Sequence, residues 1–143
     1  GNPEGTPIEV FDGIREGVLR DRSQFYKDLS ESFYGANREG ADVSQGAKDD
    51  FWRQGMLVNL AAAYDCVKAF SETDQTSDLE AIDVPFLIAQ GDDDQIVPIG
   101  AGAEEAIKLV KKGTLKVYPG APHGIYGSYQ KTLDQDILAF IED

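Results

Sequence analysis

Apolar residues in the first half of the chain recur at helical spacing, which predicts helices. Thr6, Pro7 and Glu9 predict the first helix start, with threonine as cap, proline in the first turn and glutamate closing a capping box. Three more helices are expected, beginning near Asp21, over about 44–52 and over about 55–70. The apolar stripes of these segments are Phe11, Ile14 and Val18; Phe25, Leu29 and Phe33; and Leu57, Leu60, Ala61, Tyr64 and Val67.

The pattern changes in the second half. Residues 84–89 form a continuous apolar run, typical of a strand that is covered on both faces. A helix over about 102–111 and a second strand over 114–118 are expected to follow. The last helix is expected to extend to about residue 141, and its predicted inward residues are Leu133, Ile137, Phe140 and Ile141.

The order strand, helix, strand, helix predicts a parallel α/β arrangement. We therefore expect an α/β fold with a helical region over 1–72, a polar connector over 73–83 and a strand-containing region over 84–143. Two parallel strands do not make a self-sufficient sheet, so the predicted fold is incomplete. An unpaired strand flank favours association, either with a polypeptide that completes the sheet or with a second copy.

Composition and charge exclude several classes of function. The 143 residues have a formal net charge of −13, which disfavours nucleic acid and anionic membranes as partners. No apolar run approaches a membrane span, and no signal peptide is expected at the start. A single cysteine, Cys66, excludes an internal disulfide and is expected to be buried in its helix. The compartment stays open, with the cytoplasm as the default expectation.

Three adjacent aspartates, Asp92, Asp93 and Asp94, lie in the turn-rich stretch 90–95 that follows the first predicted strand. Functional groups of open α/β sheets gather at this end of a strand. One interpretation is an acid that orients a histidine, and another is a solvated turn with a capping aspartate. A cation site is a third, although three consecutive aspartates cannot all point at one ion.

The only histidine, His123, lies in a proline- and glycine-rich loop that follows the second predicted strand. It is either a surface loop residue or a positioned base. Neighbouring parallel strands lie about 5 Å apart, so a carboxylate of the aspartate turn can reach the imidazole. Such a pair is two-thirds of a Ser-His-Asp triad, with the acid before the histidine in chain order.

Several motifs resemble the C-terminal half of an α/β-hydrolase. They are Ile82-Asp83-Val84-Pro85, Gly91-x-x-Asp94-x-x-Val97-Pro98 and Gly120-Ala121-Pro122-His123-Gly124. The stretch 59–74, with Ala63-Tyr64-Asp65-Cys66, resembles the cofactor-free haloperoxidases, also called arylesterases or perhydrolases. So does Phe11-Asp12-Gly13-Ile14-Arg15, and the resemblance covers essentially the whole chain.

The resemblance implies roles for individual residues. Asp94 would be the triad acid and His123 the base of a serine esterase that acts on aryl or short-chain carboxylic esters. Water, or hydrogen peroxide in perhydrolysis, would clear the acyl-enzyme, and the family needs no metal or organic cofactor. The substrate-binding candidates, for which plain packing is the alternative, are Trp52, Met56, Leu57 and Ile125.

The sequence departs from the family at the nucleophile, because it contains no Gly-x-Ser-x-Gly elbow. The resemblance makes residues 1–72 the helical cap and residues 84–143 the C-terminal part of the hydrolase core. It places the serine and the oxyanion hole upstream of the cap, on an N-terminal half. We therefore expect the chain to be inactive by itself and to need this half as its partner. The alternative is a non-catalytic fragment or assembly module that associates through its open sheet edge. Related enzymes use the same layout for lactone hydrolysis or dehalogenation.

Overall fold

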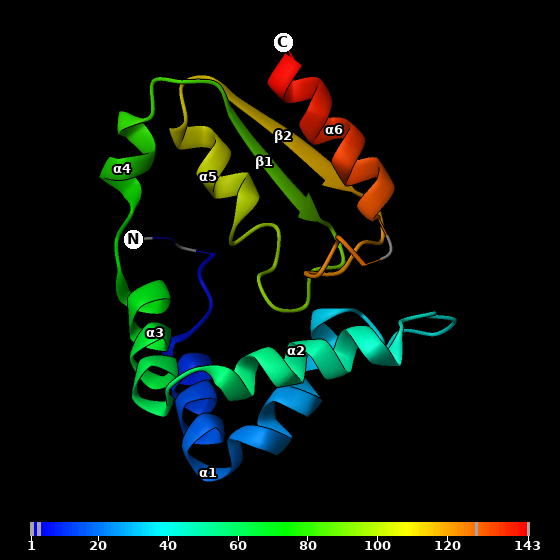
Figure 1. Ribbon diagram of the computed structural model, residues 1–143. Helices are drawn as coiled ribbons and strands as arrows, with labels where there is room; N and C mark the ends of the chain where they lie inside the picture. The colour runs from blue at the N-terminus through cyan, green and yellow to red at the C-terminus, as the bar shows by residue number, and fades with distance from the viewer. Residues whose placement is uncertain (1, 3, 128, 143) are drawn as a thin grey trace.

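The structure is a computed structural model that describes residues 2, 4–127 and 129–142. Helices form a layer at one end of a small sheet, and further helices flank its strands (Figure 1). No helix in the described part of the chain is long and apolar enough to cross a membrane. The elements in chain order are α1 (Ile8–Phe33), α2 (Gln45–Leu57), α3 (Leu60–Glu72), α4 (Thr76–Ala81), β1 (Phe86–Gly91), α5 (Ala103–Leu109), β2 (Gly113–Tyr118) and α6 (Gln130–Glu142).

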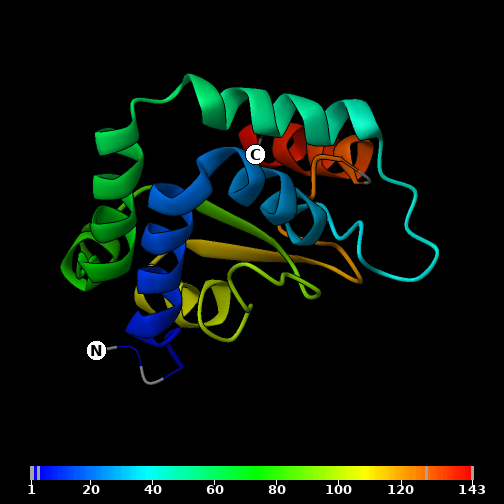
Figure 2. The ribbon, with the colours of Figure 1, turned by 90° about the horizontal axis from the view of Figure 1, so that it is seen from below.

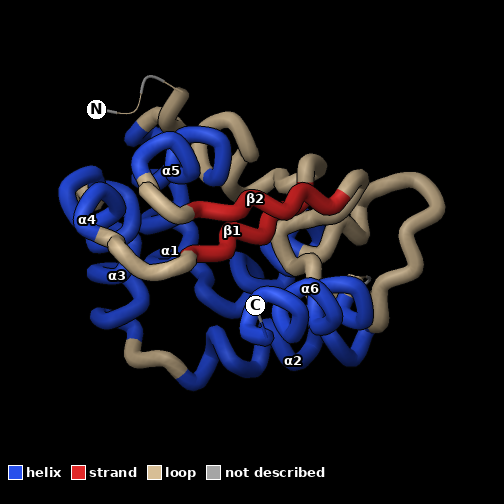
Figure 3. Tube along the Cα trace, turned by 90° about the horizontal axis from the view of Figure 1, so that it is seen from above, coloured by secondary structure: helices blue, strands red, loops and turns tan. Residues whose placement is uncertain are grey.

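The sheet among the described residues consists of β1 and β2, which pair in parallel as predicted. Phe86 lies opposite Gly113 and Gly91 lies opposite Tyr118. Helices α5 and α6 lie on opposite faces of the pair (Figure 3). Both strands run toward the helical layer of α1, α2 and α3, so the loops after them lie next to that layer (Figure 1). The two segments with candidate chemistry therefore meet at one end of the molecule.

The first strand begins and ends two residues later than predicted. It starts at Phe86, whose N–H donates to the Lys112 carbonyl at 3.0 Å. Pro85 has no N–H to donate to a ladder, so it stays outside the strand. At the other end, the pairing continues through Gln90 and Gly91, beyond the predicted end of the strand at residue 89.

The first helix has the break that the sequence predicts near Asp21. This residue has non-helical angles, φ −157° and ψ 84°, inside α1. Its carboxylate accepts the Gln24 N–H at 3.0 Å and so caps the second segment. The capping box predicted for Thr6 is wrong, because α1 begins at Ile8 and its cap residue, Pro7, has no side chain that could accept a hydrogen bond.

The boundary between α2 and α3 differs from the prediction. The break falls at Val58 and Asn59 rather than before residue 55. The Asn59 side chain accepts the N–H groups of Ala61 and Ala62 at 2.9 and 3.4 Å, which caps α3. The stripe predicted for this region is therefore split between two helices, and only its Val67 is buried.

The buried core of the strand region is small. It consists of Tyr118, Ala121 and Ile125, against which Ala89, Tyr129 and Leu133 pack. Two predicted inward residues of α6, Ile137 and Ile141, are exposed because a two-stranded sheet offers too narrow a face to cover them. Cys66, expected to be buried, is also exposed.

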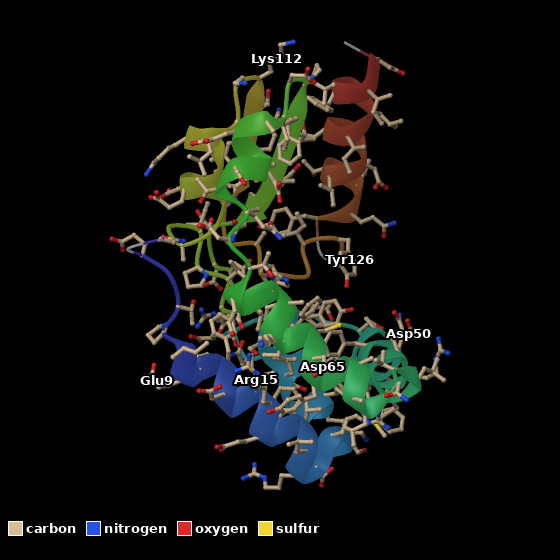
Figure 4. The ribbon with its side chains drawn as sticks, turned by 90° about the vertical axis from the view of Figure 1, so that its left-hand side faces the viewer. Glu9, Arg15, Asp50, Asp65, Lys112 and Tyr126 are labelled. Atoms are coloured by element: carbon tan, nitrogen blue, oxygen red, sulfur yellow. The ribbon has the colours of Figure 1, made fainter. Side chains whose placement is uncertain are left out.

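Large apolar side chains remain uncovered on several elements. Most lie on α3, on α6 and in the segment that joins α2 to α3, and they are Leu57, Val58, Leu60, Tyr64, Phe70, Ile137, Leu138 and Ile141. Figure 4 shows Asp65 on the outer side of α3, with Lys112 at the end of the sheet farthest from the helical layer. The predicted connector, residues 73–83, contains the short helix α4.

Tyr118 makes the free energy of unfolding depend on pH. Its hydroxyl donates to Asp136 at 2.8 Å, and burial together with this hydrogen bond raises the pKa of Tyr118 to about 12. An unfolded tyrosine loses its proton near pH 10, whereas the folded one keeps it. We therefore expect the free energy of unfolding to fall as pH rises from about 10 to about 12. Urea unfolding across this range should show a shallower fall for Tyr118→Phe; an unchanged slope would contradict the assignment.

Candidate active site

Asp94 and His123 come together at the carboxyl ends of the two strands. The Nδ1 atom of His123 lies 2.8 Å from Oδ2 of Asp94, across 29 residues of sequence. The Asp94 side chain is 3% exposed and that of His123 is 34% exposed. An ionised carboxylate only accepts hydrogen bonds, so Nδ1 carries the proton of the neutral imidazole. The pair thus has the geometry in which an acid orients a general base.

The carboxylate of Asp94 is oriented by groups of its own loop. Its Oδ1 accepts the N–H groups of Ile96 and Val97 at 2.9 and 2.8 Å. Its Oδ2 accepts the side-chain amide of Gln90 at 3.1 Å, in addition to the imidazole. Asp94 therefore makes the local turn contacts of a capping aspartate and also contacts the histidine.

The three adjacent aspartates point to three different partners. Asp92 accepts the N–H of Gly120 at 2.6 Å, which ties the two loops together. Asp93 binds the Arg38 guanidinium through two hydrogen bonds of 2.6 and 2.8 Å, and these bonds lower the pKa of Asp93. In the described part of the chain no group of three His, Cys, Asp or Glu residues could hold a metal ion.

A close backbone contact holds the aspartate loop against the histidine loop. A Cβ on Gly91 would lie 2.0 Å from the carbonyl oxygen of Ala121, so only glycine fits there. The N–H of Asp93 donates to the same carbonyl at 3.1 Å, and the N–H of Asp92 donates to the Tyr118 carbonyl at 3.3 Å. The Gly-x-x-Asp spacing thus has a structural cause, because the glycine lets the aspartate loop approach the histidine loop.

The imidazole packs against the end of α1. The Phe33 and His123 rings are 4.9 Å apart in an edge-on arrangement, and the Gly124 N–H donates to the Phe33 carbonyl at 2.8 Å. None of the residues that the structure describes forms a hydrogen bond with the other ring nitrogen, Nε2. The geometry therefore leaves Nε2 available to a hydroxyl group of another molecule.

Of the four predicted substrate-binding residues, Ile125 contacts His123 directly, since its N–H donates to the His123 carbonyl at 2.9 Å. The indole of Trp52 donates to the Ser23 hydroxyl at 3.1 Å and lies under the Lys27 ammonium, within the helical layer. Ile125 belongs to the core under the strands, Met56 is half-buried and Leu57 is 74% exposed. Substrate binding by these residues stays a prediction.

The aromatic residues near the histidine are Phe33 and, behind it, Phe51, whose ring centroid lies 4.6 Å from that of Phe33. The sequence identified Phe33 only as part of the apolar stripe of α1. Phe33 is the last residue of α1 and lies just before a glycine-containing loop. This position was the feature of the sequence that could have indicated a role near the site. Figure 2, which views the molecule from below, shows α1 in front of the strands, and Figure 4 shows Tyr126 between the helical layer and the strands.

The strand order, the helical layer over the strand ends and the acid–histidine pair define part of an α/β-hydrolase. The family model described as "Serine aminopeptidase, S33" matches residues 17–128, and the chain belongs to this family. Its fold resembles that of a bromoperoxidase from Bacillus anthracis, with a TM-score of 0.88 and 27% identity, over 93% of this chain and 48% of that one.

Curated relatives narrow the resemblance to the haloperoxidases, as the sequence motifs predicted. The chain is 59% identical to a non-heme haloperoxidase of Rhodococcus erythropolis over 99% of its own length and 52% of the relative's. It is 47% identical to a bifunctional esterase/perhydrolase of Acinetobacter calcoaceticus, over 98% of its length and 51% of the relative's. The chain thus spans about half the length of the curated relatives that it matches.

Proposed function

We propose that this chain supplies the acid and the base of a serine esterase, with Asp94 as the acid and His123 as the base. The observation that carries the proposal is the 2.8 Å contact between His123 Nδ1 and the buried Asp94 carboxylate, with Nε2 left available. In this mechanism Nε2 takes the proton of a serine hydroxyl as the serine attacks the ester carbonyl. The imidazolium then returns the proton to the leaving alcohol, while Asp94 stabilises its charge.

The relatives support the choice of an ester as substrate. One of them is named as an esterase and perhydrolase, and the aryl or short-chain carboxylic esters implied by the sequence fit that name. Water clears the acyl-enzyme in hydrolysis and hydrogen peroxide clears it in perhydrolysis. Each step uses only the serine, the histidine, the aspartate and an oxyanion hole, so no metal or organic cofactor takes part.

We infer that the nucleophile lies on the part of the relatives that this chain does not span. The sequence holds no Gly-x-Ser-x-Gly elbow, and no serine among the described contacts of His123 replaces it. The uncovered apolar residues of α3 and α6, such as Tyr64 and Ile141, provide surface for such a partner. An N-terminal half of the hydrolase is therefore the proposed partner.

A complementation experiment tests this proposal. The remaining part of the Rhodococcus erythropolis relative is expressed separately and mixed with this chain, and hydrolysis of p-nitrophenyl acetate is followed. We expect neither polypeptide to turn over alone and the mixture to show saturable activity. The loss of one oxyanion donor alone costs about 10²–10³ in rate, so without the nucleophilic serine of the elbow and its oxyanion hole we expect this chain to be inactive. Activity in the isolated chain, or none in a mixture shown by size to have associated, would contradict the proposal.

The second candidate function is a non-catalytic module, which the missing elbow favours. In that case the exposed apolar faces join two copies of the chain instead of two halves of a hydrolase. A stable homodimer that excludes the complementary half would support this alternative.

A further inference from the structure

A short segment at the end of α1, residues 33–38, contacts both loops of the acid–histidine pair, and we call it the latch segment. On the acid side, the Arg38 guanidinium makes its two hydrogen bonds to Asp93, and Asn37 exchanges two side-chain hydrogen bonds with Gln95 at 2.9 and 3.0 Å. Asp93 and Gln95 are the residues on either side of Asp94. The latch segment therefore binds the acid loop immediately before and immediately after the acid.

The same segment contacts the histidine loop. Phe33 accepts the N–H of Gly124, the residue after the histidine, and places its ring edge-on to the imidazole. A Cβ on Gly124 would lie 2.7 Å from the Tyr34 ring, so the two segments are in close contact. Gly35 has a φ of +67° and lies against Pro122, the residue before the histidine. One segment thus touches the chain neighbours of both His123 and Asp94.

We infer that Arg38 and Asn37 are positioning residues, which set the distance and angle between Asp94 and His123. The catalytic consequence rests on the function proposed above, but the positioning itself does not. Backbone contacts to the histidine loop fix only the first half of the acid turn, through Asp92 and Asp93. The second half of the turn is held from β1 by Gln90, which donates to the Asp94 carboxylate at 3.1 Å and to the Val97 carbonyl at 2.6 Å. The latch segment holds it as well, through the side chain of Gln95, which lies between those two residues.

The strength of these contacts sets the size of the expected effect. The Arg38 and Asp93 side chains are 49% and 35% exposed, so solvent weakens their attraction. A two-point guanidinium–carboxylate contact nevertheless fixes orientation. Asp94 also keeps its own hydrogen bonds to Ile96 and Val97 when the side-chain contacts of the latch segment are removed. Loss of the latch-segment contacts should therefore make the geometry between Asp94 and His123 less fixed. We expect about a tenfold fall in kcat rather than inactivation.

The single histidine of the sequence makes a direct test possible without any enzymatic activity. Nitrogen-15 spectra of this chain report which ring nitrogen of neutral His123 carries the proton. We expect the wild type to hold the Nδ1–H form and the double variant Arg38→Ala, Asn37→Ala to show a mixture of both forms. Asp94→Asn supplies the fully released reference, because its side chain no longer selects the Nδ1–H form.

Control variants separate positioning from a general loss of structure. Arg53→Ala removes an exposed arginine of α2 from its aspartate, Asp50, without touching the acid loop, and its spectrum should match the wild type. Arg38→Lys keeps the charge without the two-point contact and should restore the Nδ1–H form in part. Circular dichroism checks that each variant is folded. A double variant that is folded and keeps the wild-type tautomer would overturn the inference.

A fusion enzyme, in which this chain replaces the matching part of the Rhodococcus erythropolis relative, supplies the catalytic readout. Removing Arg38 and Asn37 should lower kcat about tenfold and change KM by less than about twofold, because substrate contacts are unaltered. If the tautomer responds but the fusion enzyme never turns over, the proposed function fails and the positioning stands. If Asp94→Asn abolishes turnover while the double variant behaves like Arg53→Ala, the inference fails and the proposed function stands.

Discussion

Replacing His123 with alanine is expected to lower kcat of the fusion enzyme by at least about 10³-fold, with little change in KM. The serine would then lose the base that takes its proton and the acid that protonates the leaving alcohol. The ring is partly exposed, so its removal creates no large buried cavity and the fold should persist. Initial rates with p-nitrophenyl acetate, together with circular dichroism, check both parts of this expectation.

The aspartate turn provides a matched pair of variants for the same claim. Asp94→Asn should lower kcat by about 10³–10⁴-fold, because asparagine no longer selects the Nδ1–H imidazole. Asp92→Asn makes the same chemical change two residues earlier and keeps an oxygen for the Gly120 N–H, so its kcat should stay within about threefold of wild type. Equal losses in the two variants would mean that the turn matters for structure and that Asp94 has no catalytic role.

Gly91→Ala is expected to destabilise the protein by more than about 3 kcal/mol or to prevent folding. The new Cβ would lie 2.0 Å from the Ala121 carbonyl oxygen, in backbone that cannot move without separating the two loops. Urea unfolding followed by circular dichroism measures the free energy of unfolding.

The control for this variant is Gly13→Ala, which makes the same change inside α1. A Cβ at Gly13 meets nothing within 4 Å, so the alanine should raise stability by about 0.5–1 kcal/mol through its higher helix propensity. A Gly91→Ala variant as stable as the wild type would show that the loops do not approach as described.

The meeting of Asp94 and His123 could be predicted from the sequence, because both follow strands that pair in parallel. The ends of two such strands lie at one edge of the sheet whatever the helices do. The break in α1 near Asp21 was also predictable, since the local capping aspartate acts over three residues. Such features depend on neighbours in the chain or on the fixed geometry of a strand pair.

Features that depend on distant contacts were not predictable. The latch contact of Arg38 with Asp93 spans 55 residues, and nothing in the local pattern around either residue indicates it. The stripe predicted for residues 55–70 failed because a single asparagine cap at Asn59 outweighed a continuous helical pattern. The exposure of Leu57 and Ile141 shows that helical periodicity identifies an apolar face but not what covers it.

One measurement tests the central claim most directly: mass spectrometry of the mixed halves after treatment with a fluorophosphonate, which labels activated serines. The account predicts one adduct, on a serine of the relative's part, formed only when this chain is present. It also predicts that the adduct is lost when this chain carries His123→Ala. An adduct on a serine of this chain, or one that forms equally well without His123, would contradict the assignment of Asp94 and His123 as acid and base.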